Sequence, residues 1–152
     1  MRFKLLIVDD EKNIRIGLKT MIEREFPEQF EISMAAQGAE ALELYQAQGA
    51  DVIITDIRMP VMDGIALIEQ VSEGPQPAIQ NGRPQILILS GYEDFRYAKA
   101  AIRYQAVDYL LKPIRRDELF AALRKCEENI AKRSQMAEQL AVTESYRLQV
   151  QS

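Results

Sequence analysis

Five short apolar runs alternate with five stretches of helical periodicity, and this alternation limits the possible folds of the 152-residue chain more than any other feature. We predict strands over residues 3–8, 30–35, 52–56, 85–90 and 107–111, and helices over 12–25, 38–48, 64–73, 94–104 and from about 116 onward. Buried strands joined by single helices pair in parallel through right-handed crossovers. The sequence therefore predicts an α/β fold whose five-stranded parallel sheet is doubly wound, (βα)5.

The bulk composition excludes several classes of function. A net charge of -4 argues against nucleic-acid binding by this segment, because phosphate contacts need a basic face. The absence of histidine excludes Ser/His triads and His-ligated metals. Cys126 is the only cysteine, so no intramolecular disulfide can form. The first apolar run, 3–8, is too short to span a membrane, and we expect a cytoplasmic protein without membrane contact.

Charged and hydroxyl side chains stand where the predicted strands end. Asp56 closes the run 52–56, and Asp9 and Asp10 follow the first run directly. Ser90 ends the fourth run and Lys112 follows the fifth. Because parallel strands bring their carboxyl ends to the same edge of a sheet, where ligands bind, we expect these side chains to form one cluster.

The residue types in this cluster suit phosphoryl transfer. Mg²⁺ is usually held by one or two carboxylates together with water and phosphate, and Asp9, Asp10 and Asp56 offer such carboxylates. One oxygen of Asp56 would remain free to attack phosphorus, while Lys112 offsets charge and the Ser90 hydroxyl donates a hydrogen bond. Helix capping is the alternative interpretation and suits Asp9 or Asp10, but it does not account for the whole set.

Over residues 3–128 the sequence resembles the receiver domain of bacterial two-component response regulators. The resemblance is carried by four motifs, Val8-Asp9-Asp10-Glu11, Asp56-Ile-Arg-Met-Pro-Val-Met-Asp-Gly64, Ser90-Gly91 and Asp108-Tyr-Leu-Leu-Lys-Pro113. It implies a flavodoxin-like or CheY-like fold and a phosphorelay signalling protein rather than an enzyme. Its phosphoryl donor would be a sensor histidine kinase.

The resemblance also implies roles for individual residues. Asp56 would be the phosphoacceptor, and Mg²⁺ would be bound by Asp9, Asp10, Asp56 and the backbone carbonyl of Arg58. Arg58, two residues past the acceptor, also lies where family side chains tune loss of the phosphoryl group, as does Tyr92, two residues past Ser90.

Further along the chain, Ser90 would be the switch hydroxyl and Tyr109 its rotating aromatic partner. Lys112 would be the family's lysine, and the Lys112-Pro113 peptide bond is expected to be cis. The switch would alter the surface formed by the fourth helix, fifth strand and fifth helix.

The segment 90–102 is most similar to receivers joined to AraC-type DNA-binding modules, which implies control of transcription; a stand-alone receiver is the alternative. We expect a receiver over 1–128 and a helical extension of the last helix over 129–152. Helical periodicity continues through Leu140, but Arg133 and Glu144 interrupt its seam. The extension is therefore either a solvated linker or a dimerising helix, and a homodimer could also use the fourth helix, fifth strand and fifth helix.

Three other functions fit the sequence less well. An aspartyl-phosphate phosphohydrolase requires its nucleophile in an Asp-x-Asp motif near the first strand. Residues 9–11 lack this spacing. An interaction module without phosphorylation would lack one of the acids or the lysine, and none is missing. Flavodoxin-like cofactor binding would need a phosphate loop rich in Ser, Thr and Gly after the first strand.

Two positions depart from the pattern of the resembled family. Gln105 closes the fourth helix where glycine is usual, so the turn must be made without the residue best suited to it. Residues 74–84 contain two glycines and three prolines and are expected to form an exposed loop on the far side from Asp56. Gly64 is expected to allow the turn into the third helix.

Overall fold

The computed structural model describes residues 2–91 and 95–151 and confirms the predicted alternation of strands and helices. The predicted bounds hold to within a residue, except that residue 94, the expected start of the fourth helix, lies outside the described residues. The elements are β1 (Phe3–Val8), α1 (Lys12–Glu25), β2 (Phe30–Ala35), α2 (Gly38–Gln48), β3 (Val52–Asp56), α3 (Gly64–Glu73), β4 (Gln85–Ser90), α4 (Phe95–Arg103), β5 (Asp108–Leu111) and α5 (Arg116–Gln151).

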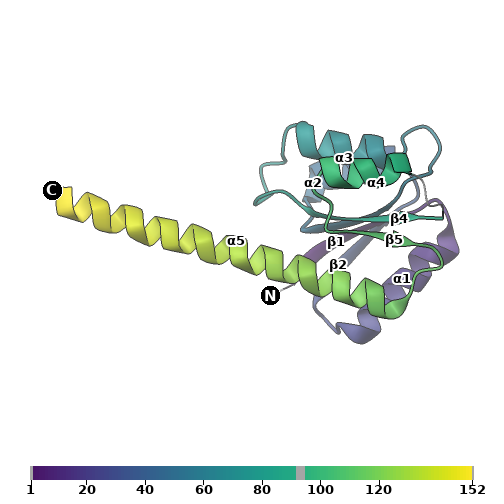
Figure 1. Ribbon diagram of the computed structural model, residues 1–152, viewed down its shortest axis with the longest axis horizontal. Coiled ribbons are helices and arrows are strands. Elements are labelled where there is room, and N and C mark those ends of the chain that lie inside the picture. The colour runs from purple at the N-terminus through teal and green to yellow at the C-terminus, as the bar shows by residue number, and fades with distance from the viewer. Residues whose placement is uncertain (1, 92–94, 152) are drawn as a thin grey trace.

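All five strands are parallel and lie in the order β2-β1-β3-β4-β5 (Figure 1). Val8 pairs with Thr55, and Asp56 pairs with Leu89. This register brings Asp9, the residue after β1, level with the end of β3. The strand ends expected to carry the functional residues therefore meet at one edge of the sheet.

Helices cover both faces of the sheet, as predicted (Figure 1). On one face α1 and α5 pack over a core that includes Ile7, Ile54, Leu87 and Leu123. On the other face α2, α3 and α4 pack over a second core that includes Tyr45, Ile53 and Ile88. Tyr97 and Ala101 of α4 are partly buried against it. The inner strands β1, β3 and β4 are buried along most of their length, which is why their sequences are continuous apolar runs rather than alternating ones.

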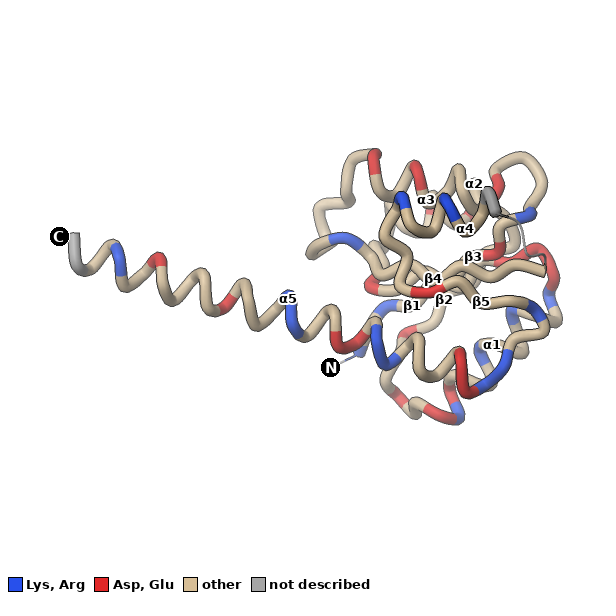
Figure 2. Tube along the Cα trace, viewed as in Figure 1, with Lys and Arg blue, Asp and Glu red and all other residues tan. Residues whose placement is uncertain are grey.

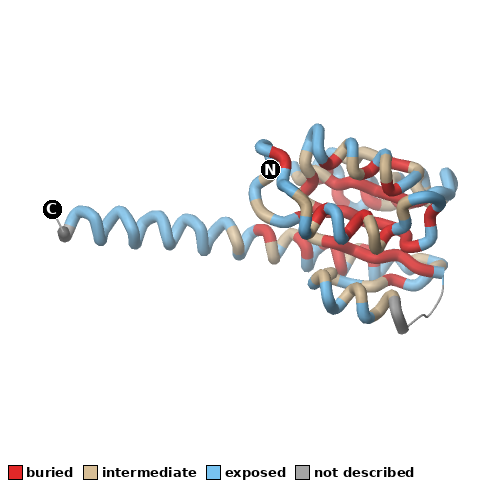
Figure 3. The backbone as a smooth tube through the Cα atoms, turned by 90° about the horizontal axis from the view of Figure 1, so that it is seen from above, coloured by how far each residue is buried: buried red, intermediate tan, exposed pale blue. Residues whose placement is uncertain are grey.

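The last helix, α5, is 36 residues long and leaves the domain partway along its length (Figure 1). Ile130 is the last buried residue among the side chains of α5 that the structure describes, and Leu140 is 68% exposed. Figures 2 and 3 show the protruding part as exposed, with single charged positions spread along it. No helix within the described residues is both long and apolar enough to cross a membrane.

The turn after α4 is made without glycine, as the sequence requires. Gln105 adopts φ 55°. Its N–H donates to the Ile102 carbonyl at 3.2 Å, and the Ala106 N–H donates to the Ala101 carbonyl at 2.9 Å. These are the paired bonds of a Schellman motif, formed here around a residue with a Cβ, which disfavours this conformation.

Candidate functional site

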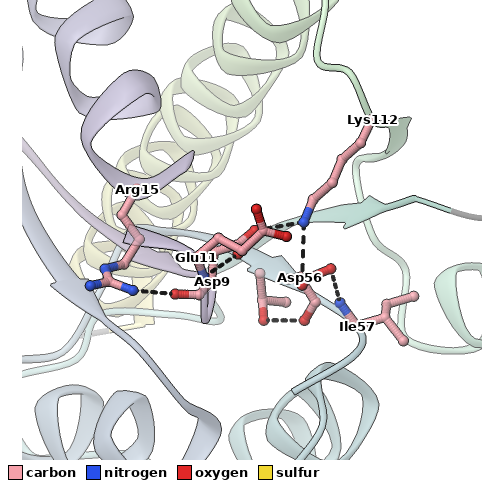
Figure 4. A network of polar contacts seen from close by, with 7 residues as sticks. Asp9, Glu11, Arg15, Asp56, Ile57 and Lys112 are labelled. Atoms are coloured by element: carbon pink, nitrogen blue, oxygen red, sulfur yellow. Dashed lines mark hydrogen bonds and ion pairs between the residues drawn. The ribbon is translucent and has the colours of Figure 1, made fainter. Parts of the chain in front are cut away.

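Three charged side chains meet at the carboxyl edge of the sheet (Figure 4). The Lys112 Nζ lies 2.9 Å from Asp9 Oδ2 and 3.3 Å from Asp56 Oδ2. Asp9 follows β1, Asp56 ends β3 and Lys112 follows β5. Asp9 is fully buried and Asp56 is 5% exposed, so the ammonium bridges two carboxylates that are largely removed from water.

The backbone around Asp56 fixes the direction of its carboxylate. The Ile57 N–H donates to Asp56 Oδ1 at 2.9 Å, and the Thr55 hydroxyl donates to the Asp56 carbonyl at 2.9 Å. Oδ1 and Oδ2 of Asp56 thus have different partners, a backbone amide and an ammonium. The backbone amide orients Oδ1, while Oδ2 forms an ion pair with Lys112.

Gly64 packs against the backbone of Asp56, which corrects its predicted role. Its φ is not in the left-handed region, so the turn does not require glycine. A Cβ at Gly64 would lie 2.1 Å from the Asp56 carbonyl oxygen and 2.9 Å from Ile57 Cα. The start of α3 therefore needs glycine because it approaches the end of β3 closely. Asp63 caps this helix by accepting from the Ala66 N–H at 2.8 Å.

Burial and neighbouring charges shift the pKa values of Asp56 and Lys112. Burial, with a further contribution from Asp9, raises the pKa of Asp56 although Lys112 opposes the shift. Burial pushes the pKa of Lys112 down, but its contacts with Asp9 and Asp56 outweigh burial and raise it. Ionised Asp56 is thus held in an environment where additional positive charge would stabilise it.

An acidic cluster at the start of α1 offers ligands for such a charge. One carboxylate oxygen from each of Asp9, Asp10 and Glu11 lies within 4.8 Å of the others. Asp9 Oδ2 is buried and has no hydrogen-bond partner beyond its ion pair with Lys112. Oxygen ligands of this kind suit Mg²⁺. The sequence reasoning did not include Glu11 as a ligand, although the carboxylate is visible next to Asp10.

The capping alternative does not hold for the first helix. The N-cap of α1 is Glu11, and no side chain caps it. Asp9 instead accepts from the Glu11 N–H at 2.9 Å, and its carbonyl accepts from Arg15 Nη1 at 2.8 Å. Asp10 is exposed.

The remaining predicted residues lie around the same edge. Ser90 is buried at the end of β4, and its carbonyl accepts from the Lys112 N–H at 2.8 Å. Tyr109 is half-buried in β5 and packs against the core on the α3 and α4 side. The Lys112-Pro113 bond is cis. Arg58 Nε donates to the Tyr97 hydroxyl at 3.3 Å. Tyr92 lies outside the described residues.

The fold and the site define a receiver of the two-component type. Residues 5–124 match the model of the response regulator receiver domain, and the chain belongs to that family. Receiver domains are signalling modules rather than enzymes. The match runs from Leu5 in β1 to Arg124 in α5.

Curated relatives include regulators of transcription. The chain is 38% identical over 123 residues to the uncharacterized transcriptional regulatory protein YesN of Bacillus subtilis, covering 81% of this chain and 32% of that protein. It is 40% identical over 112 residues to the transcriptional regulatory protein HptR of Staphylococcus aureus, covering 74% of this chain and 41% of HptR. The chain thus matches less than half the length of these relatives.

Solved receiver structures have the same fold. The receiver of AraT, a response regulator from Geobacillus stearothermophilus, superposes with a TM-score of 0.74 at 36% identity, covering 88% of this chain and 99% of that one. The chemotaxis protein CheY4 of Vibrio cholerae gives a TM-score of 0.70 at 28% identity, covering 83% and 99%.

Proposed function

We propose that this chain accepts a phosphoryl group on Asp56 from a sensor histidine kinase and so switches an output, the control of transcription, in the cytoplasm. The observation that carries the proposal is the arrangement of Asp56, whose Oδ1 is fixed by the Ile57 N–H at 2.9 Å while Oδ2 lies 3.3 Å from Lys112 Nζ. A carboxylate held in this way, near two further acids and an ammonium, suits a nucleophile for phosphorus.

The transfer is a displacement at phosphorus. A carboxylate oxygen of Asp56 forms the new P–O bond while the P–N bond to the donor imidazole breaks and its electron pair returns to nitrogen. Lys112 offsets the negative charge on the transferring group, since its Nζ is already 3.3 Å from Asp56 Oδ2. The Ser90 hydroxyl would donate to a phosphoryl oxygen. The product is an aspartyl phosphate, and the donor leaves with a free imidazole.

The acids present fit a magnesium ion. Asp9 Oδ2 is buried and has no hydrogen-bond partner beyond its ion pair with Lys112. It would hold the ion together with the neighbouring carboxylates of Asp10 and Glu11, Asp56 and the backbone carbonyl of Arg58. Bound there, Mg²⁺ supplies positive charge next to the transferring phosphoryl group. The raised pKa of Asp56, caused first by burial and then by Asp9, supports the need for such charge.

Ser90 and Tyr109 are proposed to read the state of Asp56. Ser90 is 2% exposed and lies next to the acceptor strand, because β4 pairs with β3. Tyr109, one strand further, is only half-buried and can change rotamer at lower cost than a core residue. Movement of Ser90 toward the phosphoryl group would open space for Tyr109 and change the surface of α4, β5 and α5.

The proposed division of the chain is a receiver over 1–128 and a helical extension over 129–152. Similarity to YesN and HptR supports a role in transcription, and any DNA contact would belong to a segment other than this acidic one. A homodimer through α4, β5 and α5 or through the α5 extension stays part of the proposal.

The test is phosphorylation by a small donor. The chain is incubated with acetyl phosphate, with Mg²⁺ or with excess EDTA, and its intact mass is measured. We expect one phosphoryl group to be added only with Mg²⁺, and none to the Asp56→Asn variant. Absence of an adduct on the wild-type chain with Mg²⁺ would sink the proposal.

A further inference from the structure

The connection between α3 and β4 is packed more tightly than its composition predicts. Residues 74–84 were expected to form an exposed loop, but Pro77 and Pro84 are buried. The loop lies at the edge of the sheet where the strands begin, away from Asp56, because it leads into Gln85 at the start of β4. Specific side-chain bonds, rather than regular structure, hold it there.

Gln80 anchors the loop to the segment before β3. Its amide nitrogen donates to the Ala50 carbonyl at 2.7 Å, and its Oε1 accepts from the Ala50 N–H at 2.8 Å. The same nitrogen donates to the Gly82 carbonyl at 2.8 Å. Gly49 makes room for this contact, since a Cβ there would lie 2.5 Å from Gln80 Oε1. The amide thus pairs with both polar groups of one backbone residue and fixes the loop to the sheet.

The anchored loop holds the side chain of Arg133. Arg133 Nη1 donates to the Arg83 carbonyl at 2.8 Å. Gly82, at φ 82°, lies under the guanidinium, and a Cβ on it would be 2.7 Å from Arg133 Cζ. A left-handed glycine is therefore used where the backbone and the planar guanidinium meet.

A second hydrogen bond holds α5 one turn before Arg133. Asn129 Nδ2 donates to Gln85 Oε1 at 2.8 Å. Asn129 and Arg133 are four residues apart, so they lie on one face of α5, toward β4 and the loop. Ile130, between them in sequence, is buried. Beyond Arg133 the described side chains of α5 are exposed.

We propose that residues 74–84 act as a clamp on α5, which extends the rigid receiver body to Arg133 and sets the direction in which the rest of the helix leaves the domain. The helix α5 then moves as one body with the sheet as far as Arg133, which is five residues beyond the proposed end of the receiver at residue 128. This proposal does not depend on phosphorylation of Asp56, because the clamp lies at the other end of the strands.

Hydrogen exchange of the whole 152-residue chain tests the clamp. Amides of residues 131–136 are followed in the wild type and in Arg133→Ala, Gln80→Ala and Gly82→Ala. We expect all three variants to exchange about two- to ten-fold faster in this segment, the range for loss of one or two hydrogen bonds. Gln80→Ala is the sharpest variant, because no described contact joins Gln80 to α5 and its effect must pass through the loop.

Lys132→Ala is the matched control, an exposed neighbour on the same helix, and should leave the exchange of 131–136 nearly unchanged. Amides of β1 and β3 must stay protected in every variant, which shows that the domain remains folded. A variant that fails this check is replaced by Arg133→Lys, which keeps a donor but not the planar group over Gly82. Equal exchange in wild type and Gln80→Ala, or an equal effect of Lys132→Ala and Arg133→Ala, would overturn the clamp.

Discussion

Lys112 lies closer to Asp9 than to the proposed acceptor, with its Nζ 2.9 Å from Asp9 Oδ2. Asp9 is fully buried, so this ammonium is the partner that stabilises its charge. The finding gives Lys112 a structural role in addition to the proposed catalytic one, since removing it leaves a buried carboxylate uncompensated.

Lys112→Met should therefore destabilise the fold as well as slow phosphorylation. We expect a loss of about 3–5 kcal/mol in the free energy of unfolding, the range for removing one partner of a buried ion pair. The double variant Asp9→Asn/Lys112→Met should recover part of this loss because the stranded charge is gone. Urea unfolding in EDTA measures the cycle, and additive effects of the two substitutions would contradict the coupling.

Magnesium should stabilise the folded chain through the cluster of Asp9, Asp10 and Glu11. The midpoint of thermal unfolding should rise with Mg²⁺ concentration and return to its starting value in excess EDTA. Asp10→Asn should weaken Mg²⁺ about ten-fold, the loss of one charged ligand at about 1.4 kcal/mol.

Glu11→Gln tests whether Glu11 is a Mg²⁺ ligand. The ligand set predicted from the sequence lacks this residue, whereas the acidic cluster in the structure includes it. We expect a weaker Mg²⁺ affinity for this variant too, because Glu11 lies within the same 4.8 Å group. Glu40→Gln, an exposed acid at the start of α2, is the control. An effect of Glu11→Gln no larger than that of Glu40→Gln would remove Glu11 from the site.

Two glycines should respond in opposite ways to the same substitution. Gly64→Ala should cost about 2 kcal/mol or more and slow phosphorylation, because the new Cβ would lie 2.1 Å from the Asp56 carbonyl oxygen, a backbone atom. Gly17→Ala in α1 meets nothing within 4 Å and should stabilise by about 0.5–1 kcal/mol. Thermal unfolding compares them, and a tolerated Gly64→Ala would contradict the close approach.

Cys126 should make stability fall at alkaline pH. Burial, more than the nearby charges of Glu127 and Asp108, raises the pKa of its thiol to about 12. In the unfolded chain the thiol has its ordinary pKa and ionises at lower pH than in the folded chain. The thiol's contribution to the free energy of unfolding is therefore complete below about pH 8.5 and is lost as pH rises toward 12. Urea unfolding from pH 8 to 11 should show this loss, and Cys126→Ala should show less of it.

The same burial predicts that native Cys126 resists alkylation. Iodoacetamide at pH 8 should modify the thiol only as urea unfolds the chain, because the thiol is both buried and protonated. Rapid alkylation of the native chain would contradict the burial of Cys126 on the side of α5 that faces the sheet.

The sequence predicted the sheet and the strand-end acids because both depend on a simple pattern. A parallel sheet aligns the ends of its strands, so Asp9 and Asp56 had to meet once the alternation of elements was recognised. The length of α5 was also predictable, since its periodicity has no glycine or proline stop.

Other features depend on side-chain contacts that no local pattern specifies. Gln80 turns a loop rich in glycine and proline into an ordered segment by pairing with Ala50, 30 residues away in the sequence. The predicted role of Gly64 was wrong because a tight turn and a close approach to the Asp56 backbone both favour glycine, so the sequence alone does not distinguish them. Tertiary proximity, not propensity, decides both cases.

The central claim is that Asp56 is the phosphoacceptor, and the most direct test locates the modified residue. The chain is phosphorylated with acetyl phosphate and Mg²⁺ and then treated with borohydride, which reduces an aspartyl phosphate to homoserine, before peptides are sequenced by mass spectrometry. We predict homoserine at position 56 and at no other aspartate. Homoserine at position 9 or 10, or none in the wild-type chain, would contradict the account.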